Sequence, residues 1–269
     1  MTNETEAKVS KFFNSIGWQT EGGVTEEARR WEDLREHAQA YVSRCRLRIL
    51  RHIPERGDNF LDVGSGPIQF PEYLAYSANF KKRYCVDLST RALDDAKAKI
   101  GDHGVFLPGS IIDMPLEDNF FDCTISLKAL FNIDKDRQEE VVRKLIRVTK
   151  PGKPIIISYA NPRPIYPHRL FRRKSKLRSA AKDPTGIRPG APLGSHYRVF
   201  PTDWWGRFND VATVNILPWH SFPAEVQKIL IPNNKLGSKL FDLLFYLEDR
   251  FPQFFIKCFH GLLVVLIKR

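Results

Sequence analysis

Residues 60–70 read FLDVGSGPIQF, and this stretch decides the fold. A short apolar run is followed by Gly64 and Gly66, and then by a segment with helical spacing. A strand, a glycine turn and a helix in this order are typical of a nucleotide-binding loop, because glycine lets the backbone approach a ligand without obstruction by a Cβ atom. The dinucleotide fingerprint requires a third glycine where Gln69 stands, and the Gly-Lys-Ser/Thr sequence of a P-loop is absent. The loop therefore lacks the signatures of NAD, FAD and ATP sites, and a plain tight β–α turn is the alternative for the loop taken alone.

Short apolar runs alternate with helical patterns along the middle of the chain. They occupy residues 59–64, 83–88, 104–109, 121–127 and 154–160. This alternation predicts a parallel, doubly wound α/β sheet that helices cover on both faces, with the ligand crevice at the carboxyl ends of the strands. Two further runs, 211–217 and 261–269, predict the last strands. Helical patterns at 9–16 and 26–52 precede the sheet.

Composition limits the classes of protein that the sequence allows. The 269 residues are 42% hydrophobic, enough for one large α/β domain or one domain with a cap. The N-terminus lacks the apolar stretch of a signal peptide, and no run of about 18 apolar residues predicts a membrane span. The four cysteines are far apart, which argues against a zinc site and a disulfide framework. These features predict a cytoplasmic protein without a bound metal, and peripheral membrane association stays open.

Positive charge is concentrated in one segment. Residues 163–188 hold nine basic side chains and one acid, a net +8 out of +11 for the whole chain. Three interpretations remain open: a solvated loop, a site for an anionic acceptor or anionic lipid, and an RNA-binding surface. Few aromatic residues intersperse the basic ones, so we expect no nucleic-acid partner.

Four ordered motifs between residues 55 and 160 resemble those of class I S-adenosylmethionine (SAM) methyltransferases. Asp62-x-Gly64-x-Gly66 is similar to the first motif of this family, and Asp87 ends the next strand 23 residues after Gly64. The segments 109–122 and 145–159 resemble the adenine-contacting segment and the turn before the fifth strand of the family. Two residues depart from the pattern: Ile68 stands where a third glycine is common, and Ser110 replaces an acid.

The resemblance implies a Rossmann-like, doubly wound, seven-stranded sheet whose last strand is antiparallel. It divides the chain into an N-terminal helical lid (1–54), a SAM-binding core (55–160), a basic cap or substrate region (161–210), and C-terminal strands and a helix that complete the core (211–269). The implied cofactor is SAM. Its implied contacts are Arg44, Asp62, Gly64, Ser65, Gly66, Asp87 (to the ribose), Leu88, Ser110, Ile111 and Leu127.

The resemblance also implies transfer of the sulfonium methyl group to an acceptor, by direct displacement. We expect a small-molecule or lipid-linked acceptor, methylated on oxygen. The sequence shows no evident general base; His168, His196, Tyr197 and Lys128 are weak candidates, each with a structural or surface role as the alternative. An RNA methyltransferase and a non-catalytic SAM-binding protein are the competing hypotheses. The phenylalanine-rich segment 239–259 predicts core, a homodimer interface, an apolar acceptor pocket or a membrane-facing surface.

Overall fold

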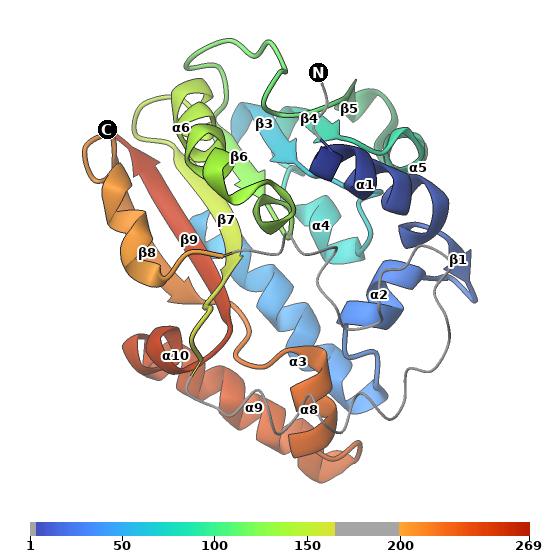
Figure 1. The fold of residues 1–269 in the computed structure, drawn as a ribbon. Coiled ribbons are helices and arrows are strands. Elements are labelled where there is room, and N and C mark those ends of the chain that lie inside the picture. Colours follow the sequence, from blue (N-terminus) through green and yellow to red (C-terminus); the bar gives the residue numbers. More distant parts are fainter. Residues whose placement is uncertain (1–3, 165–198) are drawn as a thin grey trace.

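The computed structural model describes residues 4–164 and 199–269 and contains a seven-stranded sheet (Figure 1). Its strand order is β5-β4-β3-β6-β7-β9-β8. The strands are β3 (Gly57–Val63), β4 (Phe80–Asp87), β5 (Gly104–Pro108), β6 (Cys123–Ser126), β7 (Pro154–Ala160), β8 (Ala212–Pro218) and β9 (Gly261–Lys268). A separate two-stranded ribbon pairs β1 (Thr20–Glu21) with β2 (Val24–Thr25).

The first five strands of the sheet are parallel, and β9 runs antiparallel to both of its neighbours. All residues of β6 and β7 are buried, as expected for central strands covered on both faces. β9 lies between β7 and β8, so the last strand of the chain is an interior strand of the sheet. The predicted fold class, a doubly wound seven-stranded sheet with an antiparallel last strand, is confirmed.

Alternate side chains along each strand point into two hydrophobic cores, which lie on opposite faces of the sheet. Phe60 of β3 packs with side chains from α3 (Glu36–Leu47), α4 (Pro71–Ala75) and α5 (Thr90–Ile100). The next residue, Leu61, packs with α6 (Gln138–Val148) and the 3-10 helix Thr202–Phe208. Ser89 caps α5, because its side chain accepts a hydrogen bond from the backbone N–H of Ala92 at the start of the helix.

The N-terminal helices differ from the predicted ones. α1 (Glu4–Phe12) begins earlier than expected and continues as a π-helical turn, Phe13–Gly17. The helix predicted over 26–52 is wrong as a single element: it divides into α2 (Glu26–Trp31), α3 and a 3-10 turn, Arg48–His52. The break lies at Asp33, whose carboxylate accepts hydrogen bonds from the backbone N–H and the guanidinium of Arg35. An aspartate that bonds to the nearby backbone in this way competes with continuation of the helix.

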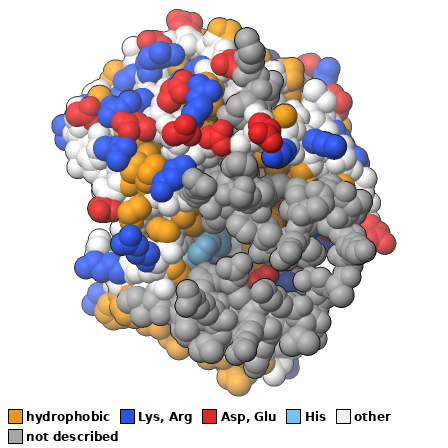
Figure 2. Space-filling model, in the orientation of Figure 1, with side chains coloured by type: hydrophobic (Ala, Val, Ile, Leu, Met, Phe, Trp, Pro, Cys, Tyr) orange, Lys and Arg blue, Asp and Glu red, His pale blue; other side chains and the backbone are white. Residues whose placement is uncertain are grey.

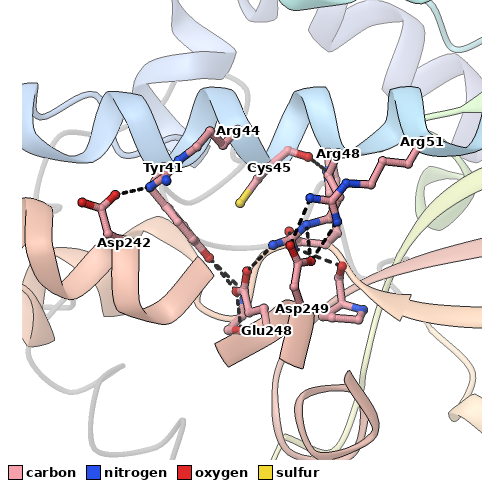
Figure 3. Close-up of polar contacts among 11 residues, drawn as sticks. Tyr41, Arg44, Cys45, Arg48, Arg51, Asp242, Glu248 and Asp249 are labelled. Carbon is pink, nitrogen blue, oxygen red and sulfur yellow. Dashed lines mark hydrogen bonds and ion pairs between the residues drawn. The ribbon is translucent and has the colours of Figure 1, made fainter. Parts of the chain in front are cut away.

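Three helices between β8 and β9 cover the side of the molecule next to α3. They are α8 (Ala224–Leu230), α9 (Lys235–Arg250) and α10 (Pro252–Cys258). A buried polar network joins α9 to α3 (Figure 3). In it, Glu248 of α9 forms an ion pair with Arg48 at 3.0 Å and accepts hydrogen bonds from Tyr41 and Ser221. Nearer the surface, Asp242 pairs with Arg44 of α3 and Asp249 with Arg51 of the 3-10 turn, so polar contacts tie α9 to α3 and to the turn that follows it.

Candidate functional site

The loop after β3 has a conformation that only a few residue types adopt readily. Gly64 and Gly66 have φ of 69° and 55°, in the left-handed region. A Cβ atom on Gly64 would clash with the Cβ of Ala129. Asp87, at the end of β4, fixes the loop: one carboxylate oxygen accepts from the N–H of Gly66 and the other from the N–H of Ser89, both at 2.8 Å. The glycines and the acid therefore form one structural unit.

Ile68 occupies the position of the family's third glycine, and its backbone keeps the conformation that glycine favours. Its φ is 49°, which is unfavourable for a β-branched residue. The side chain is 1% exposed and packs in the core with Tyr41, Cys45 and Tyr73. Burial of the isoleucine side chain thus stabilises the strained backbone. The residue departs from the family pattern, but the backbone conformation at this position is still the one that glycine favours.

A narrow cavity lies over this loop at the carboxyl ends of β3 and β4. Residues from the N-terminal helical segment, including Phe13 and Trp18, form its opposite wall. At one side the hydroxyl of Ser110 donates to the carboxylate of Glu6 on α1. The predicted cofactor contacts that line this cavity are Gly64, Ser65, Gly66, Asp87, Leu88, Ser110, Ile111 and Leu127.

Two predicted contacts lie elsewhere. Asp62 is buried beneath the loop, where it forms an ion pair with Arg83 of β4. Burial raises the pKa of Asp62, and the Arg83 guanidinium opposes that rise. Arg44 points toward α9 and pairs with Asp242 (Figure 3). Neither side chain lines the narrow cavity, because each is already engaged with a partner that the sequence pattern does not reveal.

A second and larger cavity, about 790 Å³, adjoins the narrow one. Several aromatic side chains line its wall, among them Trp31, Tyr41, Phe131, Tyr159 and Trp219, and charged side chains line it as well. The lining residues come from both ends of the sequence and from the carboxyl ends of β6 and β7. The two cavities share five wall residues: Phe13, Glu27, Tyr73, Lys128 and Asn132.

The shared wall carries a cluster of buried charges around Lys128. Its ammonium contacts Glu32 directly and lies 3.7 Å from Glu27. Burial alone would lower the pKa of Lys128, but these two carboxylates outweigh it and raise the pKa. Glu32 also pairs with Arg46 at 3.2 Å. The raised pKa favours the protonated form of Lys128, which argues against its candidacy as a base, and its ion pairs fit the structural role that was one of the alternatives.

His220 is a lining residue of the larger cavity that the sequence analysis missed. Burial lowers its pKa to about 4, so the imidazole is neutral at physiological pH. A signal was present in the sequence: His220 follows a predicted strand by only a few residues, and parallel strands end at the ligand edge of the sheet. The other candidates, His168, His196 and Tyr197, lie outside the described residues, as does most of the basic stretch 163–188.

The described part of the chain has neither a cluster of metal-binding side chains nor a membrane-spanning helix. Within residues 4–164 and 199–269, no group of three or more His, Cys, Asp or Glu side chains is placed to hold a metal ion. In the same residues, none of the helices combines the length and the apolar character needed to cross a bilayer. Cys123 is buried in β6, where it is part of the core.

Comparisons with known proteins agree with this geometry. A family model described as "Methyltransferase domain" matches residues 61–157. No curated protein matches the sequence. Among solved structures, a SAM-dependent methyltransferase from Archaeoglobus fulgidus superposes with a TM-score of 0.54 and 15% identity, over 86% of this chain and 94% of that chain.

Two further structures share the fold at low sequence identity. Geranyl diphosphate C-methyltransferase from Streptomyces coelicolor A3(2) has a TM-score of 0.57 and 14% identity, over 99% of both chains. Phosphoethanolamine N-methyltransferase 1 from Haemonchus contortus has a TM-score of 0.59 and 8% identity, over 100% of this chain and 50% of that one. Residues 61–157 thus match a methyltransferase domain, and the chain has the fold of SAM-dependent methyltransferases.

Proposed function

We propose that SAM occupies the narrow cavity and that the methyl acceptor occupies the larger one. The observation that carries this proposal is the wall of five residues that the two cavities share. A methyl group directed from one cavity to the other would cross this wall beside Lys128 and Asn132. Direct displacement needs the acceptor atom in line with the sulfonium methyl, and positioning alone supplies a large part of such a rate enhancement.

The roles of the cofactor contacts follow from their places in the narrow cavity. Gly64, Ser65 and Gly66 lie against the amino-acid end of SAM, and Asp87 accepts hydrogen bonds from the ribose hydroxyls. Ser110 and Ile111 lie near the adenine ring, with Leu88 and Leu127 as apolar contacts. This assignment rests on the shape of the loop and on the exposure of these residues to one cavity.

The acceptor that we propose is a small or lipid-linked molecule, methylated on oxygen. The aromatic wall of the larger cavity favours an acceptor with a substantial apolar part. Two structural neighbours were crystallised with geranyl diphosphate and with phosphoethanolamine, both of which carry phosphate. Lys135 lines the same cavity and supplies a cationic group for an anionic acceptor, whereas Arg30 and Arg46, which also line it, are paired with Glu26 and with Glu32.

His220 is the group that we propose accepts the proton of the acceptor hydroxyl. A neutral imidazole has a nitrogen lone pair available, whereas Lys128 is held protonated by its carboxylates. General bases contribute about 10² to 10⁴ to a rate. Replacing His220 by alanine is therefore expected to lower kcat about a hundredfold or more without changing the Kd for SAM.

The measurement is a steady-state assay with radiolabelled SAM, together with calorimetric titration of SAM. His52→Gln is the control, because His52 is half-buried in the 3-10 turn outside both cavities and its pKa is also lowered by burial. In the unmodified protein, the contribution of His220 should decline only as the pH falls through about 4. A His220→Ala variant with full kcat would show that this imidazole takes no part in proton removal.

SAM affinity is expected to depend on pH through Asp87. Burial raises the pKa of Asp87 to about 6, against the hydrogen bonds from Ser89 and Gly66. Only the ionised carboxylate accepts from both ribose hydroxyls, so affinity is full well above pH 6, is about halved at pH 6 and is about tenfold lower at pH 5. Calorimetry in two buffers of different ionisation enthalpy should detect release of about half a proton on SAM binding at pH 6. A Kd that is constant from pH 5 to pH 8 would contradict this assignment.

The proposed function itself is tested with tritiated SAM and cell extract separated into lipid, small-molecule and RNA fractions. Label in the lipid or small-molecule fraction, in a product that releases methanol on hydrolysis or is otherwise shown to be an O-methyl compound, is the expected result. Label in the RNA fraction, with binding that weakens steeply as salt rises, would instead establish the RNA methyltransferase alternative.

A further inference from the structure

An apolar face runs along the outside of α9 and onto α10. Its residues, which we call the outer apolar face, are Leu236, Leu240, Leu243, Tyr246, Phe251 and Phe254. Leu236 is 59% exposed, Tyr246 61% and Phe254 56%. Figure 2 shows hydrophobic side chains along the lower edge of the molecule, where Figure 1 places α9 and α10. Large exposed apolar residues gathered in this way mark a surface that contacts something.

Helical geometry places the α9 members of this face on one stripe. The spacing from Leu236 to Leu240 to Leu243 is four and then three residues, which keeps their side chains on one side of the helix. The opposite side of α9 is fixed by Phe241 and Glu248, which are buried against α3. The polar network of Figure 3 thus holds the helix in place, so its outward stripe is a surface of the folded protein.

Basic side chains border the outer apolar face. Lys235, Lys239, Arg250 and Lys257 are exposed on the same two helices. Among the described residues, no ion pair involves any of these four. The acids of α9 are already used, since Asp242 pairs with Arg44, and Asp249 with Arg48 and Arg51. The net field around the face is therefore positive.

We propose that the outer apolar face docks on the surface of an anionic lipid bilayer. Leucine and aromatic side chains that point outward from a helix with basic borders match the arrangement of helices that lie in the membrane interface. Two copies of the chain packed through this face would bring like charges together, which disfavours a symmetric dimer as the occupant. An anionic bilayer matches both features of this surface: its hydrocarbon region accommodates the apolar side chains, and its negative headgroups attract the basic ones.

The docking surface lies close to the larger cavity. α8 contributes Ala224, Glu225 and Gln227 to the wall of that cavity, while Ile229 and Leu230 of the same short helix are 42% and 47% exposed. Docking would therefore bring the cavity within one helix of the lipid headgroups. The conclusion that an acceptor could enter from the bilayer rests on the proposed function; the docking itself goes beyond it.

The experiment is co-sedimentation of the full chain with phosphatidylcholine vesicles, with and without about 30% phosphatidylserine. Strong binding to the anionic vesicles and weak binding to the neutral ones is expected, with loss of the difference at high salt. Leu240→Glu/Leu243→Glu should lower the partition coefficient at least tenfold. Lys239→Gln/Arg250→Gln should lower it about thirtyfold on anionic vesicles only.

Leu74→Glu is the matched control, because Leu74 is 42% exposed on α4 and lies outside the face. Calorimetry with SAM on the same samples reports the cofactor site independently, so failure of docking and failure of the proposed function are separate results. Absence of vesicle binding, or equal binding to neutral and anionic vesicles, would overturn the proposal. A dimer in light scattering that Leu240→Glu/Leu243→Glu dissociates, without vesicle binding, would assign the face to self-association instead.

Discussion

Replacing Asp87 by asparagine is expected to weaken SAM binding about a hundredfold or more. The amide has one acceptor oxygen where the carboxylate has two, and its NH₂ group would face the N–H of Gly66, now 2.8 Å from a carboxylate oxygen. Hydrogen bonds to a charged group contribute about 1.5–3 kcal/mol each, so loss of the ribose contacts alone accounts for roughly 3 kcal/mol. Displacement of the glycine loop adds to that loss.

Calorimetric titration of SAM measures this effect directly. Asp94→Asn is the control, because Asp94 is exposed on α5, the helix that follows Asp87. Circular dichroism and thermal unfolding should be recorded for both variants, to separate a change in the site from a loss of folding. A folded Asp87→Asn protein that binds SAM with unchanged affinity would show that the cofactor does not lie against the end of β4.

Replacing Glu248 by alanine is expected to have the largest effect on stability, a loss of about 3–5 kcal/mol in the free energy of unfolding. The substitution leaves the guanidinium of Arg48 without its buried partner, and it also removes acceptors of Tyr41 and Ser221. Glu248 is fully buried, so water cannot replace these bonds. Trp219 and Tyr41 line the larger cavity next to this network, so the wall of that cavity should loosen as well.

Urea unfolding monitored by fluorescence gives the free energy for each variant. Asp249→Asn is the comparison, because Asp249 is about one-third exposed and should contribute less than about 1 kcal/mol. Arg48→Met/Glu248→Leu should recover much of the lost stability, since removal of both charges leaves neither one unpaired. If Glu248→Ala were no less stable than Asp249→Asn, the buried pair would not hold α9 to the 3-10 turn that follows α3.

Much of the sheet could be predicted from local features of the sequence. The apolar runs that end at Val63, Asp87 and Ala160 are strands because continuous burial requires them to be apolar on both faces. The turn chemistry of Gly64 and Gly66 is equally local, and so is the cap at Ser89. Each of these features depends on neighbours within a few residues, which is why a single sequence was sufficient.

The pairing of charges could not be predicted in the same way. Arg48 and Glu248 are 200 residues apart, and nothing near either one indicates its partner. Arg44 and Asp62 were assigned to the cofactor for the same reason, since their long-range partners Asp242 and Arg83 are visible only in the fold. Lys128 shows the reverse case: its place after a strand was predicted, but the carboxylates of Glu27 and Glu32 that decide its protonation come from another part of the chain.

The position of β9 in the sheet affects how the chain can fold while it is being synthesised. β7 pairs with β9 along its whole length, from Pro154 with Ile267 to Ala160 with Gly261, yet about a hundred residues are synthesised between the two strands. Until residues 261–268 emerge from the ribosome, the nascent chain carries an apolar strand with an open edge, which is a template for misassociation with other chains. Pairing of β9 with β7 joins residues that are far apart in the sequence, and it is therefore a slow step in folding. Nascent chains stalled before residue 261 should consequently depend on chaperones to stay unaggregated, whereas those that have released β9 should not.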